Sequence, residues 1–262
     1  MPAPLDFIAP LFVPANRPER FAKAAASGAD AVILDLEDAV APADKATARA
    51  ALAKHFTKRP VLVRINAAGT PWHEDDLDAV SRLPLAAIML PKAERVADCT
   101  RIAAIHPVVA LIETAHGIAA ARSLATSGSV ARIAFGSIDF AADLGCDHVR
   151  EALAPARGEL VLAARLGGLS APLDGVTTAL SDPAVTADDA RHARSLGFGG
   201  KLLIHPAQVA PVVEAFRPSP DELDWARRVL ASGDGVARVD GTMVDAPVRA
   251  RARAIMARGI GC

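Results

Sequence analysis

The chain has 262 residues, of which 52% are hydrophobic and 23% charged, and its formal net charge is −1. This composition excludes a disordered chain, and the charge balance gives no reason to expect nucleic acid or an anionic membrane surface as a partner. Three scattered cysteines without a CxxC pair exclude a disulfide framework and indicate reduced thiols. With no signal-peptide pattern and no apolar window long enough for a membrane helix, we expect a soluble, cytoplasmic protein.

Eight short apolar segments predict eight β-strands, and helix-like segments rich in Ala, Arg and Leu separate them. Apolar strands that are buried on both faces and followed by helices are typical of a parallel sheet. Eight such units in a chain of this length favour a closed (β/α)8 TIM barrel over a doubly wound sheet, and we assign it to residues 1–206. The expected strands are 10–15, 31–37, 61–66, 86–92, 108–114, 131–137, 171–177 and 201–206.

Residues 207–262 are predicted to form a C-terminal helical extension. Ser219 is followed by Pro220 and, three residues on, by Glu222, which is the pattern of a capping box that opens a helix. A Gly/Asp-rich turn at 233–241 then leads to a last, basic helix. We expect this extension to contact a neighbouring subunit.

Polar residues stand at the ends of the predicted strands, at steps of about one βα unit. In TIM barrels the active site lies at the C-terminal ends of the strands, so we expect the functional site among these residues. They are Asp35, Arg64, Lys92, Glu113, Asp139, Asp174 and His205.

Two of these carboxylates predict a metal site. Glu113 ends the fifth strand and Asp139 lies just past the sixth. Neighbouring strands are ~4.8 Å apart, so both side chains come within reach of one ion. Hard oxygen ligands without a convergent His/Cys set suit Mg²⁺. The alternative is that Glu113 caps the following turn and Asp139 merely starts the next helix.

Arg64 lies within an apolar strand, where a buried guanidinium is costly unless it is paired or bound to an anion. It either pairs with Asp35 or Glu37 on the neighbouring strand or binds a substrate carboxylate, and both can hold together. Lys92 has the same ambiguity. We expect Asp35, Glu37 and Lys92 to lie behind the substrate-binding groups and hold them in position, with Asp38 helping the loop to turn.

Nucleophilic hydrolase chemistry is not predicted. The sequence has no G-x-S-x-G, and we expect no Ser or Cys at a strand-to-helix turn beside a His. His148 stands in a helix-like context and is expected on the surface. His205 ends the eighth strand, where it either lines the barrel mouth or bonds to a neighbouring loop.

Motifs follow one another along the chain from "LFVPANRPERFAKA" near its start to "DGTMVDAPV" near its end. Between them stand "GADAVILDLEDAV", "VRINAAGTPWHEDDL", "IMLPKAE", "ALIETAHG", "AFGSIDFAADLG" and "LGFGGKLLIHPAQV". Together these motifs resemble the HpcH/HpaI aldolase/citrate lyase family, in particular its citrate lyase beta subunit-like and malyl-CoA lyase branch. The resemblance covers about residues 9 to 258. It implies a TIM-barrel lyase that is a homotrimer or a multiple of it.

The resemblance also implies roles for individual residues. It implies Mg²⁺ held by Glu113 and Asp139, with Arg64 gripping the carboxylate or carbonyl of a 2-oxo acid. In some relatives the residue at the position of Asp245 arrives from a neighbouring subunit as the acid/base; the alternative for Asp245 is the N-cap of the last helix. Arg64, Asp245 and Glu113 are thus the expected catalytic residues, and the expected substrate-binding residues are Arg64, Glu113, Asn16, Arg17, Lys23, Gly136 and His205, with Asn16, Arg17 and Lys23 in the thioester-binding region.

The implied reaction cleaves or forms a β-hydroxyacyl-CoA thioester such as malyl-, methylmalyl- or citramalyl-CoA, giving a 2-oxo acid or glyoxylate plus acyl-CoA. Two alternatives stay open: a class II aldolase on free hydroxy-oxo acids, and a subunit of a larger complex that serves an acyl carrier protein. Ala15 departs from the family pattern, because many relatives have Gly there. If that loop needs a positive φ or close approach to a phosphate, Ala15 would hinder binding of the CoA carrier.

Overall fold

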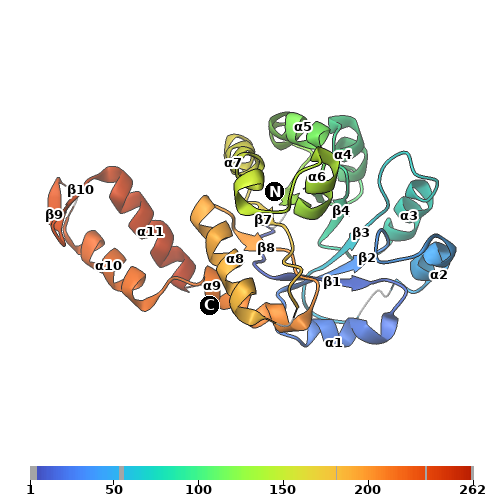
Figure 1. Cartoon of the computed structure of the whole chain (residues 1–262), viewed down its shortest axis with the longest axis horizontal. Helices are drawn as coiled ribbons and strands as arrows, with labels where there is room; N and C mark the ends of the chain where they lie inside the picture. The colour runs from blue at the N-terminus through green and yellow to red at the C-terminus, as the bar shows by residue number, and fades with distance from the viewer. Residues whose placement is uncertain (1–4, 53–55, 181, 234, 261–262) are drawn as a thin grey trace. The chain divides into compact units, whose positions relative to one another are not determined.

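Eight parallel strands follow one another around one sheet in the order of the sequence (Figure 1). The computed structural model describes residues 5–52, 56–180, 182–233 and 235–260. Leu11 and Leu203 pair in parallel, and the Phe12 N–H donates to the Leu203 carbonyl at 2.8 Å, so the chain beyond the last strand joins the first. The predicted TIM barrel is confirmed. Its strands are β1 (Pro10–Pro14), β2 (Ala31–Asp35), β3 (Val61–Arg64), β4 (Ala87–Leu90), β5 (Val108–Ile112), β6 (Arg132–Phe135), β7 (Leu173–Asp174) and β8 (Gly200–Lys201).

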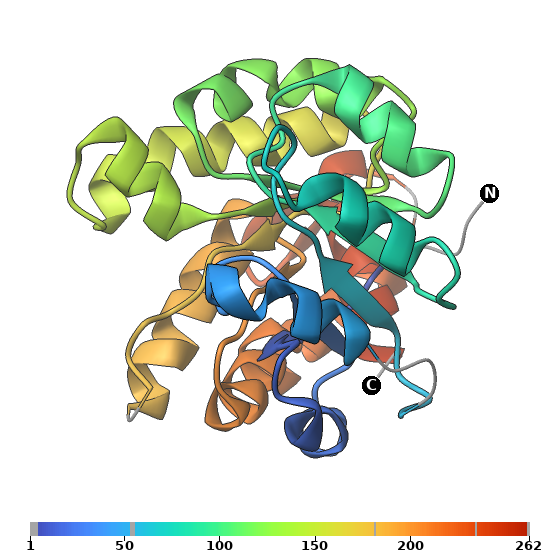
Figure 2. The same ribbon diagram turned by 90° about the vertical axis from the view of Figure 1, so that its right-hand side faces the viewer.

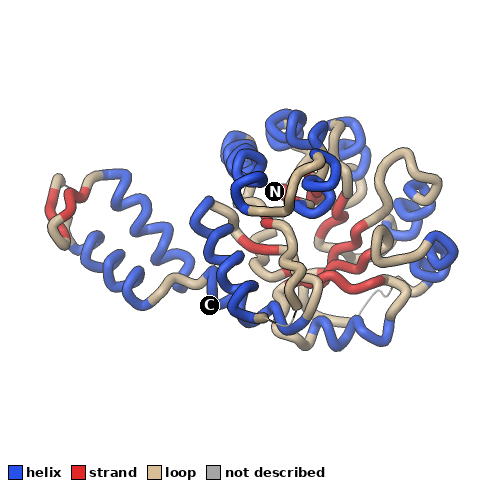
Figure 3. Tube along the Cα trace, viewed as in Figure 1, coloured by secondary structure: helices blue, strands red, loops and turns tan. Residues whose placement is uncertain are grey.

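Helices surround these strands, as the colouring by secondary structure and the view turned by 90° show (Figures 2 and 3). They are α1 (Phe21–Ala25), α2 (Lys45–Ala50), α3 (His73–Val80), α4 (Val96–Ala103), α5 (Ala115–Thr126), α6 (Ser137–Leu144), α7 (Arg150–Leu166) and α8 (Pro183–Leu196), with short 3-10 turns η1 (Pro18–Arg20), η2 (Pro42–Asp44) and η3 (Pro206–Gln208). Helix α9 (Val209–Phe216) follows the barrel. No helix among the described residues is long and apolar enough to cross a membrane.

The barrel interior is filled by apolar side chains from alternate positions of the strands, such as Ile33, Leu62, Met89 and Leu111. Their alternation with outward-facing residues, which the helices cover, explains why the strands read as continuous apolar runs. Arg132, the first residue of β6, is the large polar exception at the N-terminal end. Its guanidinium is buried and donates to backbone carbonyls before β1 and after α7, and burial lowers its pKa to about 10.

A second buried polar cluster lies between the last two strands and helix α7. Asp174 of β7 accepts from Arg157 at 2.9 Å and lies 3.3 Å from the Lys201 ammonium of β8. Burial by itself would raise the pKa of Asp174, but the two cations outweigh it and hold the pKa below its usual value. These ion pairs therefore tie the short strands β7 and β8 to the surrounding helices.

Contacts divide the chain into two compact units, residues 1–213 and 214–262, so the division falls seven residues after the expected boundary. The second unit contains α10 (Pro220–Ala231), α11 (Ala246–Ile260) and a two-stranded antiparallel sheet of β9 (Ala237–Val239) and β10 (Thr242–Val244). The capping box at Ser219 is present with both of its hydrogen bonds. Both predicted helices are found, but the segment predicted as a turn contains β9 and leads directly into β10.

Candidate active site

Arg64 and Asp35 are the last residues of β3 and β2, and the parallel register places them directly opposite each other. Their side chains form a bidentate ion pair, with Nε to Oδ1 and Nη2 to Oδ2 both at 2.7 Å. Asp35 also accepts from the backbone N–H groups of residues 37 and 39, so the carboxylate holds both the guanidinium and the loop after β2. Of the two carboxylate pairings considered from the sequence, that with Asp35 is therefore present, and that with Glu37 is present as well.

The remaining edge of the Arg64 guanidinium faces two further acids. Its Nη1 lies 3.1 Å from Oε2 of Glu37 and 3.3 Å from Oδ2 of Asp38, and its Cζ lies 4.8 Å from the centre of the Phe12 ring. Burial acts against the charge, but the three acids outweigh it and raise the pKa of Arg64, which stays cationic. Asp38 therefore does more than help the loop to turn, because its carboxylate faces Arg64.

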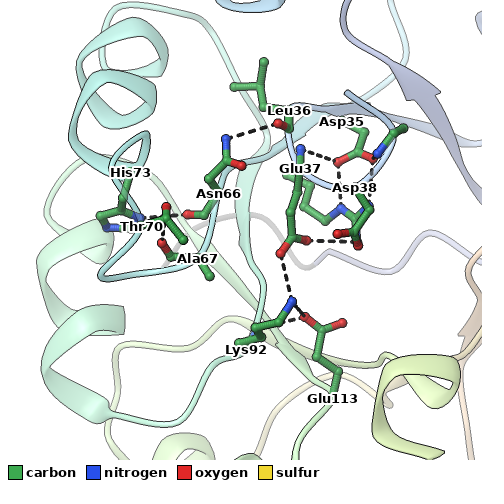
Figure 4. A network of polar contacts seen from close by, with 12 residues as sticks. Asp35, Leu36, Glu37, Asp38, Asn66, Ala67, Thr70, His73, Lys92 and Glu113 are labelled. Carbon is green, nitrogen blue, oxygen red and sulfur yellow. Dashed lines mark hydrogen bonds and ion pairs between the residues drawn. The ribbon is translucent and has the colours of Figure 1, made fainter. Parts of the chain in front are cut away.

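Lys45, at the start of α2, holds the loop after β2 in place. Its buried ammonium donates to the backbone carbonyls of Leu36 and Glu37 and to Oδ1 of Asn66, each at 2.7 Å. Asn66 donates in turn to the Leu36 carbonyl (Figure 4). Neither residue was singled out from the sequence.

Glu37 and Lys92 connect the Arg64 side of the barrel mouth to the Glu113 side. Lys92 Nζ lies 3.1 Å from Oε1 of Glu37 and 3.6 Å from Oε1 of Glu113 (Figure 4). Burial by itself would lower the pKa of Lys92, but the two carboxylates reverse the effect and raise it. The backbone N–H of Lys92 also donates to Glu113 at 2.9 Å, from a residue with a φ of 46°. Such a left-handed conformation is unfavourable for a lysine and is retained where its surroundings fix it.

Glu113 follows β5 and packs against Gly136, which follows β6. The Gly136 N–H donates to the Ile112 carbonyl at 2.9 Å, so the two strand ends stay paired to this point. A Cβ added to Gly136 would lie 2.3 Å from Oε2 of Glu113. Glycine is therefore needed at 136 to leave room for the carboxylate. Burial, and next the charge of Glu37, raise the pKa of Glu113 to about 8.

The arrangement of carboxylates fits a bound cation. Oε2 of Glu113 is buried and accepts no hydrogen bond from the described residues. Glu113 and Asp139, in the first turn of α6, line the same cavity of about 400 Å³, together with Arg64, Asp35 and Asp38. Within the described ranges no three His, Cys, Asp or Glu side chains form a ready metal cage. Two carboxylates plus open positions for water and substrate are what Mg²⁺ uses.

A second cavity of about 370 Å³ adjoins the first, and Phe12, Pro14 and Ile204 line both. Lys23 and His205 line this second cavity. Asn16 and Arg17 lie in the loop after β1 but line neither cavity; Asn16 contacts Asp44 and Arg17 pairs with Glu19. The backbone conformation at position 15 does not require glycine, because Ala15 is not among the described residues with a positive φ; the other ground, close approach to a phosphate, stays a prediction.

The structure contradicts the expectation that no Ser lies at a strand-to-helix turn beside a His. Ser137 is the first residue of α6, directly after β6 and Gly136, and its Oγ lies 2.9 Å from Nε2 of His148. His148 is exposed but lies in the bend between α6 and α7 rather than in a helix. The contact was missed because α6 ends at Gly145, whose φ of 70° reverses the chain and brings residue 148 back to residue 137.

Asp245 belongs to the second unit, at the start of α11. Its Oδ1 accepts from the Val248 N–H at 3.2 Å, which is the N-cap geometry considered as the alternative for this residue. This cap leaves the second carboxylate oxygen of Asp245 outside that hydrogen bond. A role at another subunit's site therefore stays a prediction.

Comparisons with known proteins agree with this geometry. The family model described as HpcH/HpaI aldolase/citrate lyase matches residues 9–206. The chain is 41% identical over 259 residues to a citrate lyase subunit beta-like protein of Mycobacterium tuberculosis, covering 95% of this chain and 94% of the relative. It is 36% identical over 252 residues to a (3S)-malyl-CoA thioesterase of Cereibacter sphaeroides, covering 90% and 88%. The solved structure of CitE from M. tuberculosis in complex with magnesium, acetoacetate and coenzyme A matches with a TM-score of 0.89 at 39% identity, covering 99% of each chain.

Proposed function

Since this chain belongs to the HpcH/HpaI aldolase/citrate lyase family, as its motifs predicted, we propose that it is a Mg²⁺-dependent carbon–carbon lyase. Its substrate is a β-hydroxyacyl-CoA thioester, which it cleaves to, or forms from, a 2-oxo acid or glyoxylate and an acyl-CoA. The observation that carries the proposal is one cavity lined by Arg64, Glu113 and Asp139. Complexes of CitE with magnesium and pyruvate, and with magnesium, acetoacetate and coenzyme A, support it.

In this proposal Glu113 and Asp139 hold Mg²⁺, which when bound polarises the carbonyl of the 2-oxo acid as a Lewis acid. Arg64 stabilises the negative charge that grows on the substrate oxygen as the carbon–carbon bond breaks, since its side chain lines the cavity. Asp35 keeps the guanidinium in place through its bidentate ion pair. The cavity of about 400 Å³ suits a short-chain acid such as a malyl, methylmalyl or citramalyl group.

The thioester carrier is proposed to occupy the second cavity. Its walls continue those of the first through Phe12 and Ile204, and the basic side chains of Arg20 and Lys23 line it. Cations beside an apolar channel suit a carrier that ends in phosphate groups. Free hydroxy-oxo acids as substrates, or an acyl carrier protein in place of CoA, are the alternatives; a free acid has no phosphate for these two cations to bind.

Asp245 is proposed as the acid/base that moves protons between the hydroxyl group and the enolate carbon. This requires a homo-oligomer, a trimer or a multiple of one, in which the extension completes the site of a neighbouring subunit. Mixing the Asp245→Ala variant with Arg64→Ala under conditions of subunit exchange is expected to restore part of the activity. No recovery after verified exchange overturns the shared site. Size-exclusion chromatography and pull-down separate a self-sufficient oligomer from a complex subunit.

The central test is a panel of hydroxyacyl-CoA thioesters with Mg²⁺, in which free thiol and 2-oxo acid are measured separately. Glu113→Gln and Asp139→Asn are expected to abolish Mg²⁺-dependent turnover while leaving the fold intact. Asp147→Asn is the matched control, because Asp147 is exposed in the bend after α6. Full activity in either cavity variant overturns the assignment of the metal site, and the absence of 2-oxo acid release from every thioester overturns the lyase.

A further inference from the structure

Ile204 is a large apolar residue that stays exposed at the barrel mouth, where the two cavities meet. It follows β8 and is 41% exposed. Ile204 lines both the first cavity, which contains Arg64, and the second cavity, which contains Lys23. Phe12 and Pro14 of β1 also line both cavities. These three apolar residues therefore form the junction between the cavities.

The register of the strands brings two of the three junction residues together. Leu11 pairs in parallel with Leu203, and in such a register the residues that follow on the two chains, Phe12 and Ile204, are neighbours as well. The Phe12 ring is also occupied on its face, because Cζ of Arg64 lies 4.8 Å from its centre. A substitution of Phe12 would therefore disturb Arg64, whereas a substitution of Ile204 changes the apolar wall of the junction.

The backbone that carries Ile204 is held by Gln208, which is buried. Oε1 of Gln208 accepts from the N–H groups of Ile204 and His205 at 3.0 and 3.2 Å, and its Nε2 donates to the Thr177 carbonyl at 2.7 Å. The side chain of Ile204 takes no part in these bonds, and its branched Cβ restricts its rotation. The junction thus presents an apolar surface in a fixed position, which is what discrimination between small substituents requires.

The carbon chain of the thioester has to pass this junction. With the 2-oxo acid beside Arg64 and the carrier in the second cavity, the carbon next to the thioester carbonyl lies between the two. This reacting acyl carbon is the one that forms or breaks the carbon–carbon bond. In an acetyl thioester it bears only hydrogens, whereas in a propionyl thioester it bears a methyl group, which would cover part of the exposed Ile204 side chain.

We infer that Ile204 is a specificity-determining residue that favours thioesters with an alkyl substituent on the reacting acyl carbon, so that propionyl-CoA is used in preference to acetyl-CoA. The inference rests on the proposed function for the placement of the acid and the carrier. Removing one methyl group from water contributes a factor of about 4 in kcat/KM, and contact with the side chain of Ile204 supplies that factor here.

The test is a competition between equal amounts of acetyl-CoA and propionyl-CoA for the enzyme with Mg²⁺ and either glyoxylate or pyruvate. In the condensation the reacting acyl carbon loses a proton and bonds to the 2-oxo carbon, whose oxygen gains a proton, so the two products differ in mass by one methylene group. Their ratio in early samples equals the ratio of the two kcat/KM values and does not depend on the amount of active enzyme. We expect a ratio of about 4 for the parent chain, about 1 for Ile204→Ala and an intermediate value for Ile204→Val.

The matched control is Ile105→Ala, in the turn after α4. It makes the same substitution at a residue that is 37% exposed and lines neither cavity, and it should keep the ratio of the parent chain. Binding gives a second readout: in titration calorimetry with Mg²⁺ and no 2-oxo acid, propionyl-CoA should bind the parent chain about 4-fold more tightly than acetyl-CoA, and Ile204→Ala should bind the two equally.

The outcomes separate this inference from the proposed function. Equal use or equal binding of the two thioesters by the parent chain overturns the role of Ile204 and leaves the lyase intact. The same follows if Ile204→Ala lowers both rates at an unchanged ratio, because Ile204 would then only support the loop. Absence of a condensation product from both thioesters overturns the proposed function, and this inference with it.

Discussion

Replacing Gly136 with Ala adds one methyl group at the point where Glu113 packs against the start of α6. The new Cβ would lie 2.3 Å from Oε2 and 2.5 Å from Cβ of Glu113, both far inside van der Waals contact. The backbone at Gly136 has φ −87° and ψ 72°, a negative φ that an alanine can adopt, so the contact decides the outcome. We expect Gly136→Ala to lower the free energy of unfolding by about 1–3 kcal/mol, the usual cost of overpacking.

A double-mutant cycle isolates that contact. Glu113→Ala would keep the Cβ at 2.5 Å, so the partner substitution is Glu113→Gly, which removes both close atoms. In that background we expect Gly136→Ala to cost less than about 0.5 kcal/mol, because the three atoms nearest to the added Cβ all belong to the removed Glu113 side chain. Gly158→Ala in α7 is the matched control: its added Cβ meets no atom within 4 Å, and it should raise the stability by about 0.5–1 kcal/mol.

We would measure the urea concentration at the unfolding midpoint for the parent chain, both single variants, the double variant and the control. The midpoints can be compared when the slope of the unfolding free energy against urea concentration does not change. An equal cost of Gly136→Ala with and without the Glu113 side chain would refute the reasoning. It would mean that the backbone at 136, and not the neighbouring carboxylate, requires glycine there.

Three further expectations concern buried groups. Lys45→Met removes three hydrogen bonds from a buried ammonium and should lower the free energy of unfolding by about 2 kcal/mol or more in urea titrations, whereas the exposed Lys58→Met should stay within about 0.5 kcal/mol. Asp174 has a lowered pKa in the folded chain, so its contribution to stability is full above the ordinary value of about 3.9 and is lost as the pH falls through the folded value. Urea midpoints of Asp174→Asn should therefore change less between pH 5 and pH 2 than those of the parent chain, and equal slopes would contradict this. Burial raises the pKa of the Cys99 thiol to about 11, so mass spectrometry should find Cys99 unmodified by a thiol reagent at pH 8 until urea unfolds the chain.

The barrel could be predicted because its strands are buried on both faces and therefore appear as apolar runs at regular spacing. The polar residues at the ends of these apolar segments were also predicted to lie at the barrel mouth, because a parallel register places Asp35 opposite Arg64. The last two strands were predicted longer than Leu173–Asp174 and Gly200–Lys201. Beyond Lys201 the pairing continues only as an isolated bridge between Leu203 and Leu11, which an apolar pattern cannot distinguish from a continuous strand. The hairpin of β9 and β10 was missed because three-residue strands are too short to show an alternation.

The contact between Ser137 and His148 could not be predicted from the pattern of strands and helices alone. In one continuous helix, residues 11 apart would be separated by ~16 Å along the axis. The contact exists because α6 stops at Gly145 in a left-handed conformation. The glycine was visible in the sequence, but whether a glycine ends a helix depends on the packing of the following segment. The same applies to Lys45, whose three acceptors come from loops after two different strands.

The charges at the barrel mouth link the cation site to the substrate. The groups described there are five carboxylates (Asp35, Glu37, Asp38, Glu113 and Asp139) and two cations (Arg64 and Lys92), a formal charge of −3 when all are ionised. A 2-oxo acid is itself an anion, so these carboxylates by themselves disfavour its binding. In the proposed site, a divalent cation between Glu113 and Asp139 would reduce the formal charge to −1, and Arg64 would then attract the acid more strongly. We therefore expect cation and acid to strengthen each other's binding, because each would favour the other by the same free energy.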